Sequence, residues 1–321
     1  MLNFRLGLSW CLLSVAFCGV AAGSLTLGSA ELPAHAVWAA LRGGADPLAN
    51  SVVIGLRLPR WLAACGVGSS LAVAGVLLQA LFRNPLADPY VLGVSGGAAA
   101  GAVLTLLLGA GLAASQYGAL AGALIATVLV MLLARGTDNL RLLLSGVVVA
   151  AGCGALITLF LVAASGDQLR GMIFWLAGDL SLAATPWRSV TLAVCGVVLA
   201  MLFATPLDVL GTGELRARTL GLDTGRWRSL ILVAAVILTA VAVTTAGTIG
   251  FVGLVIPHAV RLLFGTSSHR IVAPAAALAG ATLVAGADLV ARTIIEPRQL
   301  PVGAIMALVG APIFAWLLRR T

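Results

Sequence analysis

Lysine is absent from this 321-residue chain, and all 19 of its basic residues are arginines. A nucleotide-binding P-loop follows the pattern Gly-x4-Gly-Lys-Ser/Thr, because its lysine side chain reaches the phosphates. The chain therefore cannot supply this kind of ATP-binding site. Any process driven by a P-loop ATPase would need that ATPase on a separate polypeptide.

Charged residues of both signs are scarce as well. They make up 9% of the chain, hydrophobic residues make up 61%, and the mean hydropathy is +1.11, whereas a soluble domain carries about 25% charged residues. The apolar residues form continuous runs near the length of about 20 residues that a membrane-spanning helix needs, not the alternating segments of a β-barrel. We therefore predict an all-α, polytopic membrane protein that forms one domain over residues 1–321.

Cysteine and histidine residues show no pattern of a metal or catalytic site. No two of the five cysteines form a Cys-x-x-Cys pair, and the three histidines lack the spacing of zinc ligands. The sequence contains no paired catalytic constellation either. We therefore expect no bound metal or cofactor and no enzymatic activity in this chain.

Ten apolar stretches predict about ten transmembrane helices. They cover residues 6–27, 58–82, 91–112, 114–134, 142–164, 190–207, 230–248, 250–264, 271–291 and 302–318. The first stretch resembles a secretory signal peptide in its Arg5 and in its small residues at 21–24. Its apolar run is nevertheless long enough to span a membrane, and further spans follow, so we expect it to remain uncleaved.

Arginine is distributed unequally between the two sides of this topology. Ten spans place both chain ends on one side, and cytoplasmic loops normally carry the excess of arginine. With cytoplasmic ends, twelve arginines lie inside and seven lie outside, the latter being Arg42, Arg57, Arg60, Arg170, Arg188, Arg292 and Arg298. This distribution predicts an N-in, C-in orientation.

Three of the outer arginines lie at the ends of spans. Arg57 and Arg60 begin the second span, and Arg292 ends the ninth. Arginines near helix ends often extend to lipid headgroups, which would make these residues membrane anchors. They would equally suit a docking surface for an acidic partner outside the membrane. The residues alone leave both interpretations open.

Glycine residues predict close helix contacts and one broken helix. Two sets recur at intervals of four residues within single spans: Gly93, Gly97 and Gly101, and Gly118 and Gly122. Small residues at this spacing let membrane helices approach closely. Residues 244–258 are apolar but contain three glycines and a proline. An unwound segment there would be tolerated only within the protein or facing a water-filled path, which suggests a transport path. A tight turn between two helices at the surface is the alternative.

The longest polar stretch, residues 208–228, lies on the predicted cytoplasmic side. Its glycines divide it into two expected short helices, at 214–220 and 224–229. A plain linker between helices needs only a few residues. The length of this stretch therefore predicts a surface for a cytoplasmic partner, with a solvated loop as the alternative.

Several sequence motifs occur together and in a fixed order along the chain. They are RLPR (57–60), GVLLQ (75–79), RNPLADP (83–89), LGVSGGA (92–98), GFVGLVIPH (250–258), AD (287–288), LPVG (300–303) and GAP (310–312). The combination resembles the FecCD family of ABC-importer permeases, the type II importers for iron–siderophores, haem and cobalamin. The resemblance covers essentially the whole chain.

The resemblance implies a fold, a location and a set of partners. It implies a type II ABC importer permease of the bacterial inner membrane, with ten helices per protomer and a homodimer whose interface contains the path. It also implies two copies of a cytoplasmic ATP-binding subunit and a periplasmic substrate-binding protein. The positions implied for docking of the binding protein are Arg57, Arg60 and Arg292, and those implied for coupling to the ATPase are Glu214, Leu215, Arg218, Leu220 and Gly221.

The motifs do not fix the ligand. The resemblance implies a metal chelate, with an iron–siderophore first and cobalamin or haem close behind. An ion-coupled secondary transporter is the alternative function, and it would need ionisable residues within the membrane. Asp179 and Asp288 are the candidates for such a role, but no inverted repeat is evident.

Overall fold

The computed structural model describes residues 2–28, 30, 32–44, 46–134, 139–181, 186–295 and 298–319, and all regular structure within these ranges is helical. Six of the described helices are long and apolar enough to cross a membrane, and one bent pair adds a seventh. Together with three shorter apolar helices, they make ten apolar helices in the described ranges. The predicted all-α architecture with about ten membrane helices is confirmed.

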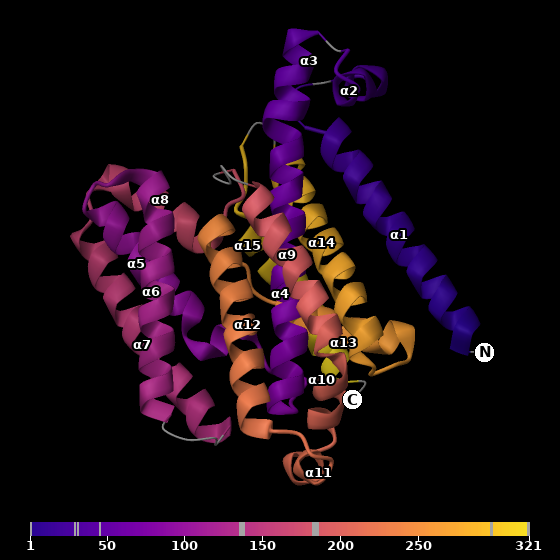
Figure 1. Cartoon of the computed structure of the whole chain (residues 1–321). Helices are drawn as coiled ribbons and strands as arrows, with labels where there is room; N and C mark the ends of the chain where they lie inside the picture. The colour runs from indigo at the N-terminus through magenta and orange to yellow at the C-terminus, as the bar shows by residue number, and fades with distance from the viewer. Residues whose placement is uncertain are drawn as a thin grey trace.

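The helices are labelled in chain order, as in Figure 1. They are α1 (Leu2–Thr26), α2 (Ala34–Leu41), α3 (Pro47–Val52), α4 (Leu58–Phe82), α5 (Val94–Leu107), α6 (Gly111–Ala134), α7 (Asn139–Ala163), α8 (Gly166–Ala177), α9 (Pro186–Leu202), α10 (Ala204–Gly211), α11 (Glu214–Thr219), α12 (Thr224–Ala246), α13 (Val252–Phe264), α14 (His269–Thr293) and α15 (Val302–Leu318). A short π-helical segment, η1 (Val53–Arg57), precedes α4, and a 3₁₀ segment, η2 (Pro89–Leu92), precedes α5.

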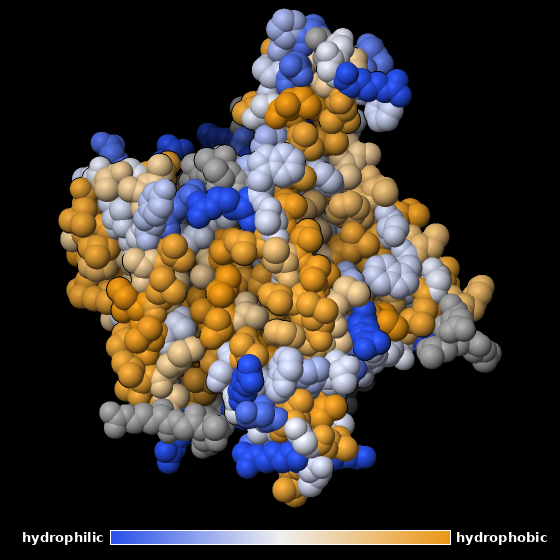
Figure 2. Space-filling view, viewed as in Figure 1, coloured by the Kyte–Doolittle hydropathy of each residue, from blue (hydrophilic) through white to orange (hydrophobic). Residues whose placement is uncertain are grey.

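The molecule has two polar ends separated by an apolar belt. In Figure 1, α2 and α3 project at one end and α11 lies at the opposite end, with both chain termini toward the α11 end. Figure 2 shows hydrophobic residues around the middle, with hydrophilic residues gathered near both ends. This arrangement agrees with the predicted N-in, C-in topology, in which α11 is cytoplasmic and α2 and α3 lie outside.

Helix α4 runs through the centre of the molecule and packs directly against the backbones of its neighbours (Figure 1). A Cβ atom placed on Gly75 would lie 2.0 Å from the carbonyl oxygen of Gly253 in α13. Between α5 and α6, a Cβ atom on Gly101 would lie 2.0 Å from the carbonyl oxygen of Gly118. Close helix packing at the recurring glycines is therefore present, and these contacts lie within one protomer.

The predicted third span, 91–112, is interrupted near its start. Residues 89–92 form η2, Gly93 has a φ of 71°, and α5 begins only at Val94. A positive φ favours glycine because glycine has no Cβ atom. Gly93 therefore serves the turn into α5 and, contrary to the prediction, does not share the helix face of Gly97 and Gly101.

Two further differences concern helix continuity. The predicted span 190–207 is a bent pair, since α9 and α10 meet at Phe203 with an angle of 60° between them. Helix α8 was not among the predicted spans, because its 12 residues are too few to cross a membrane. It begins with a capping box formed by Ser165 and Gln168, a local signal for a helix start.

The glycine-rich stretch 244–258 contains a break between α12 and α13. Residues 247–251 are not helical, and Gly247 and Phe251 both have positive φ values, 69° and 68°. The hydroxyl group of Tyr90 holds this break, because it accepts a hydrogen bond from the Ile249 nitrogen at 2.8 Å and donates one to the Ile249 oxygen at 2.9 Å. Of the two predicted alternatives, the unwound segment is the one that forms.

Candidate functional site

Three arginines from separate elements meet at the outer end of the molecule. Arg57 ends η1, Arg60 lies in the first turn of α4, and Arg292 lies in the last turn of α14. They line one recess of about 170 Å³, here called the arginine recess, whose other lining residues are Gly28, Ala30, Val52, Leu56 and Gln299. The structure thus brings the predicted docking residues together, and their docking role stays a prediction.

Arg57 is bonded to backbone groups inside the protein. Only 5% of this residue is exposed. Its Nη1 donates to the carbonyl oxygens of Leu25 and Thr26, both at 2.8 Å, and its Nη2 donates to the carbonyl oxygen of Ala30. The first two carbonyls end α1, where a helix carries partial negative charge. Arg57 therefore fixes the end of α1 to the start of α4.

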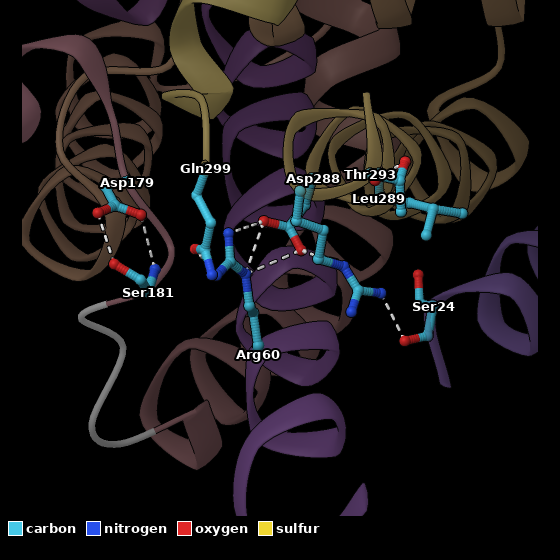
Figure 3. Close-up of polar contacts among 9 residues, drawn as sticks. Ser24, Arg60, Asp179, Ser181, Asp288, Leu289, Thr293 and Gln299 are labelled. Atoms are coloured by element: carbon cyan, nitrogen blue, oxygen red, sulfur yellow. Dashed lines mark hydrogen bonds and ion pairs between the residues drawn. The ribbon is translucent and has the colours of Figure 1, made fainter. Parts of the chain in front are cut away.

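Arg60 and Arg292 share one carboxylate, that of Asp288; Figure 3 shows the contact with Arg60. Arg60 Nε lies 2.9 Å from Oδ1 and 3.1 Å from Oδ2 of Asp288, and Arg60 Nη2 lies 2.8 Å from Oδ1. Arg292 Nε lies 3.7 Å from Oδ2. Two further donors also have partners: Arg60 Nη1 donates to Gln299 Oε1 at 2.7 Å, and Arg292 Nη2 donates to the backbone carbonyl oxygen of Ser24. The two side chains are held in fixed positions by the surrounding chain.

The pairing of Asp288 was not predicted, since this acid was considered only for ion coupling. A usable signal was present: opposite charges lie at the outer ends of two otherwise apolar spans, and charged residues within membrane proteins pair with one another. Asp179, the other candidate for ion coupling, accepts hydrogen bonds from the backbone and hydroxyl of Ser181 (Figure 3). Both acids are therefore bonded within the chain.

At the opposite end of the molecule, α11 presents two leucines to solvent. Leu215 is 81% exposed and Leu220, just after the helix, is 64% exposed, whereas Ala217 is fully buried. The turns on both sides need glycine, because Gly213 has a φ of 115° and Gly221 a φ of 81°. The predicted coupling residues thus form a small projection that exposes two leucines and is bounded by tight turns.

Charged side chains hold α11 in place. Glu214 accepts a hydrogen bond from Arg218 Nη2 at 2.7 Å, and its carboxylate lies 3.7 Å from Arg228 Nη1 in α12. Arg218 Nε also donates to Thr224 Oγ1 at 3.2 Å. Because these contacts join α11 to the start of α12, the projection is tied to a membrane helix.

The prediction of a separate short helix at 224–229 is wrong. These residues form the first turns of α12, whose N-terminus is capped by the side chain of Asp223, which accepts a hydrogen bond from the Arg226 nitrogen at 3.1 Å. Such a cap satisfies a backbone N–H group that has no partner within the helix. Gly225 in the first turn therefore does not interrupt the helix.

Helix α10, which precedes α11, contacts the start of α14. Asp208 Oδ1 accepts a hydrogen bond from the backbone nitrogen of His269 at 3.1 Å and also contacts Nδ1 of the same residue. The carboxylate thereby occupies the position of a cap at the N-terminus of α14. Helix α14 then runs to the arginine recess, to which it contributes Arg292.

A wide cavity of about 570 Å³ lies beside the break between α12 and α13. Its lining, which includes no acidic or basic residue, consists of Tyr90, Ser95, Gly96, Ala99, Ala150, Gly154, Ile157, Leu176, Ala177, Thr248, Gly250, Gly303 and Ala304. Such a lining offers room to a bulky ligand but no charged group to hold it. In the described ranges, no group of three or more His, Cys, Asp and Glu side chains is placed to bind a metal ion.

Comparison with known proteins identifies relatives along nearly the whole chain. Residues 13–320 match the model of the FecCD transport family. The chain is 43% identical to the vitamin B12 import system permease protein BtuC of Serratia proteamaculans, over 92% of this chain and 91% of the relative. It is 45% identical to the cobalamin import system permease protein BtuC of Halobacterium salinarum, over 88% and 77% respectively. It is 41% identical to YvrB of Bacillus subtilis, an uncharacterized ABC transporter permease protein, over 92% and 89%.

Solved structures agree with this relationship. An inward-facing ABC transporter assigned to the metal-chelate type superposes with a TM-score of 0.84 at 28% identity, over 100% of both chains. PsaBC from Streptococcus pneumoniae gives a TM-score of 0.57 at 19% identity, over 81% of this chain and 90% of the other, and supports the fold alone. The fold of the whole chain is therefore that of the first transporter.

Proposed function

Because the chain belongs to the FecCD transport family, we propose that it is the permease subunit of an importer for a metal chelate, with cobalamin as the first candidate. Two of the relatives are named as vitamin B12 or cobalamin permeases. The similar solved structure is assigned to the metal-chelate type. The motifs alone favoured an iron–siderophore, which is now the second candidate together with haem.

The class of the protein follows from the family and does not depend on the ligand. The chain is a multi-pass ABC-importer permease of the cytoplasmic membrane and is not itself catalytic. A permease of this class works with an ATP-hydrolysing subunit and a substrate-binding protein. The class predicted from the motifs is confirmed, and the family membership speaks against an ion-coupled secondary transporter.

The observation that carries the proposal is the presence of two distinct surfaces at opposite ends of the apolar belt. Outside, the arginine recess gathers three guanidinium groups, which suit the acidic side chains of a periplasmic binding protein. Inside, α11 exposes Leu215 and Leu220, which suit an apolar groove on the ATPase. A partner on each face is what an importer driven by a separate motor requires.

We assign the 570 Å³ cavity to the translocation path and its missing wall to a second copy of this chain. The cavity is bounded by η2, α5, α7, α8, α15 and the break before α13, and it is open on one side. A homodimer would close it and would bind two ATPase subunits, one on each α11. Native mass spectrometry of the purified permease in lipid nanodiscs should therefore give two copies, and a monomer under conditions that support uptake would contradict this assignment.

The two surfaces suggest how transport proceeds. The binding protein captures a scarce, bulky ligand and docks at the arginine recess. ATP binding closes the ATPase pair, and α11 passes this movement to α12 through the contacts of Glu214. The membrane helices then shift between outward-open and inward-open populations. A path without charged groups releases the ligand readily once it opens inward.

Uptake by proteoliposomes tests the proposed function. The vesicles contain this chain and its ATPase, with ATP inside and the loaded binding protein outside. Cyanocobalamin, a ferric siderophore and haem are tested separately as labelled ligands. We expect ATP-dependent accumulation of cyanocobalamin. Accumulation of only the siderophore or only haem would change the ligand, and accumulation of none by the assembled complex would contradict the import of metal chelates.

A further inference from the structure

Asp288 occupies the position that an acidic partner would be expected to seek. Asp288 is 2% exposed, and its carboxylate contacts the guanidinium groups of Arg60 and Arg292, two of the three arginines that line the arginine recess. Figure 3 shows it facing Arg60. The contact to Arg60 uses both carboxylate oxygens. An internal anion is therefore already bound to the groups proposed to receive an external one.

We propose that Asp288 is a resident counter-ion that positions Arg60 and Arg292 and competes with the binding protein's acidic side chains for them, so that it sets the strength of docking. This inference rests on the proposed docking function of the arginine recess. Asp288 does not line the recess itself. It acts through the two arginines and is a positioning residue.

The sign of the effect follows from electrostatics. A guanidinium group that already faces a carboxylate at 2.8 Å attracts a second carboxylate less strongly, and the two carboxylates repel each other across it. Removal of the resident charge should therefore tighten docking. A purely structural role predicts the opposite, because disordered arginines would bind the partner less well.

A resident charge would also serve the transport cycle. Charged pairs across an interface raise the rate of association and, when buried, slow dissociation. An importer has to release its empty binding protein before the next loaded one can dock. If the Asp288 carboxylate pairs again with Arg60 and Arg292 as the partner leaves, the empty binding protein stays bound for a shorter time.

Gln299 offers an independent way to change the same charge. Its Oε1 accepts a hydrogen bond from Arg60 Nη1 at 2.7 Å at the recess, and the residue is exposed. Gln299→Glu adds a carboxylate beside Arg60 without touching Asp288, whereas Asp288→Asn removes one while keeping the shape of the side chain. The double variant restores the original charge of the cluster.

The experiment measures binding of the loaded binding protein to the permease–ATPase complex in nanodiscs, at low and high salt. Asp288→Asn should tighten binding by about fivefold, mostly through slower dissociation, and Gln299→Glu should weaken it by about fivefold, each change corresponding to about 1 kcal/mol. The double variant should bind nearly as the parent does, and Asp288→Glu should rescue the parent behaviour. The affinity of Asp288→Asn should also depend more steeply on salt, because one more positive charge faces the partner.

Weaker or unchanged binding by an assembled Asp288→Asn complex would overturn the proposal. If that variant does not assemble, the double variant decides: binding close to that of the parent supports the proposal, and binding as weak as that of Gln299→Glu alone overturns it. The separate variant Arg60→Glu distinguishes a failure of docking at the recess from a failure of the role proposed for Asp288. Normal affinity of Arg60→Glu would refute docking at the recess altogether, whereas lost affinity of Arg60→Glu with a normal Asp288→Asn would refute only the role of Asp288.

Discussion

The backbones of α4 and α14 touch at Gly68 and Gly280. A Cβ atom on Gly68 would lie 2.2 Å from the carbonyl oxygen of Gly280, and a Cβ atom on Gly280 would lie 2.3 Å from the carbonyl oxygen of Gly68. Small residues allow such approaches between membrane helices, which lack a hydrophobic drive to associate within lipid. Helices α4 and α14, which carry Arg60 and Arg292, therefore form one tightly packed unit.

Gly280→Ala should destabilise the protein, because one methyl group forces these two backbones apart. Overpacking of this kind costs about 1–3 kcal/mol. The measurement is the midpoint of thermal unfolding in detergent. Gly286→Ala is the matched control in the same helix, since its Cβ atom would only approach Val20 at 3.8 Å. Equal midpoints for the two variants would show that the contact at Gly280 is looser than described.

Arg57→Glu combined with Arg60→Glu should abolish docking of the binding protein and uptake of ligand. Like charges placed against a partner's acids cost several kcal/mol, which corresponds to about a hundredfold or more in affinity. The measurement is the affinity of the nanodisc complex for the loaded binding protein. Arg188→Glu is the control, because this exposed arginine also lies on the outer side but does not line the recess.

Leu56→Glu tests docking without disturbing the internal structure. Substitutions of Arg57 and Arg60 cannot do this, because both side chains also bond groups within the chain. Leu56 lines the arginine recess and is 67% exposed, so its replacement leaves the internal hydrogen bonds intact. We expect weaker docking for Leu56→Glu and a smaller effect for Leu56→Gln, measured as before. Equal affinities for these two variants would argue that the charge at the recess does not contact the partner.

Leu215→Asp combined with Leu220→Asp should weaken association with the ATPase. Burial of a leucine side chain contributes about 1.5–3 kcal/mol, so the loss should be about tenfold or more per residue. Co-purification of the ATPase and coupled hydrolysis are measured, and docking of the binding protein should persist. Leu108→Asp is the control, because Leu108 is 75% exposed but lies directly after α5, far along the chain from α11. Normal ATPase assembly by the double variant would remove α11 from the interface.

Tyr90→Phe should loosen the break between α12 and α13. The substitution removes both hydrogen bonds to Ile249, and a buried backbone group left without a partner costs about 1–3 kcal/mol. We expect a lower midpoint of thermal unfolding and an altered uptake rate, because the break lines the proposed path. An unchanged midpoint and an unchanged rate would indicate that other contacts hold this segment.

The sequence predicted helix bounds well where one long apolar run forms one continuous helix. The prediction failed where a helix is bent or too short to span a membrane. The bounds of α4 and α15 agree with the predicted spans 58–82 and 302–318. The bend between α9 and α10 had a signal that was missed: Pro206, three residues after the break at Phe203, has no N–H group for the carbonyl of Leu202. Helix α8 escaped prediction because a twelve-residue helix gives no spanning signal.

The candidate site was predictable as a set of residues but not as a network. The positions of Arg57, Arg60 and Arg292 followed from span ends and family motifs. Their partners did not, because the contact between Arg60 and Asp288 joins residues 228 positions apart and depends on how α4 packs against α14. The acceptors of Arg57 are backbone carbonyl groups. Every residue has such a group, so the sequence does not indicate which of them a side chain will reach.

Helix α14 begins at the contact with Asp208 in α10, the helix before α11, and ends in the arginine recess. Its 25 residues span about 37 Å, so partners seated on the two faces of the membrane would sit at opposite ends of a single rod. Pro274 lies near its inner end, where the missing N–H group weakens the helix. A bend in α14 would therefore form most readily near Pro274, while the part of the helix between Pro274 and the arginine recess contains no further proline.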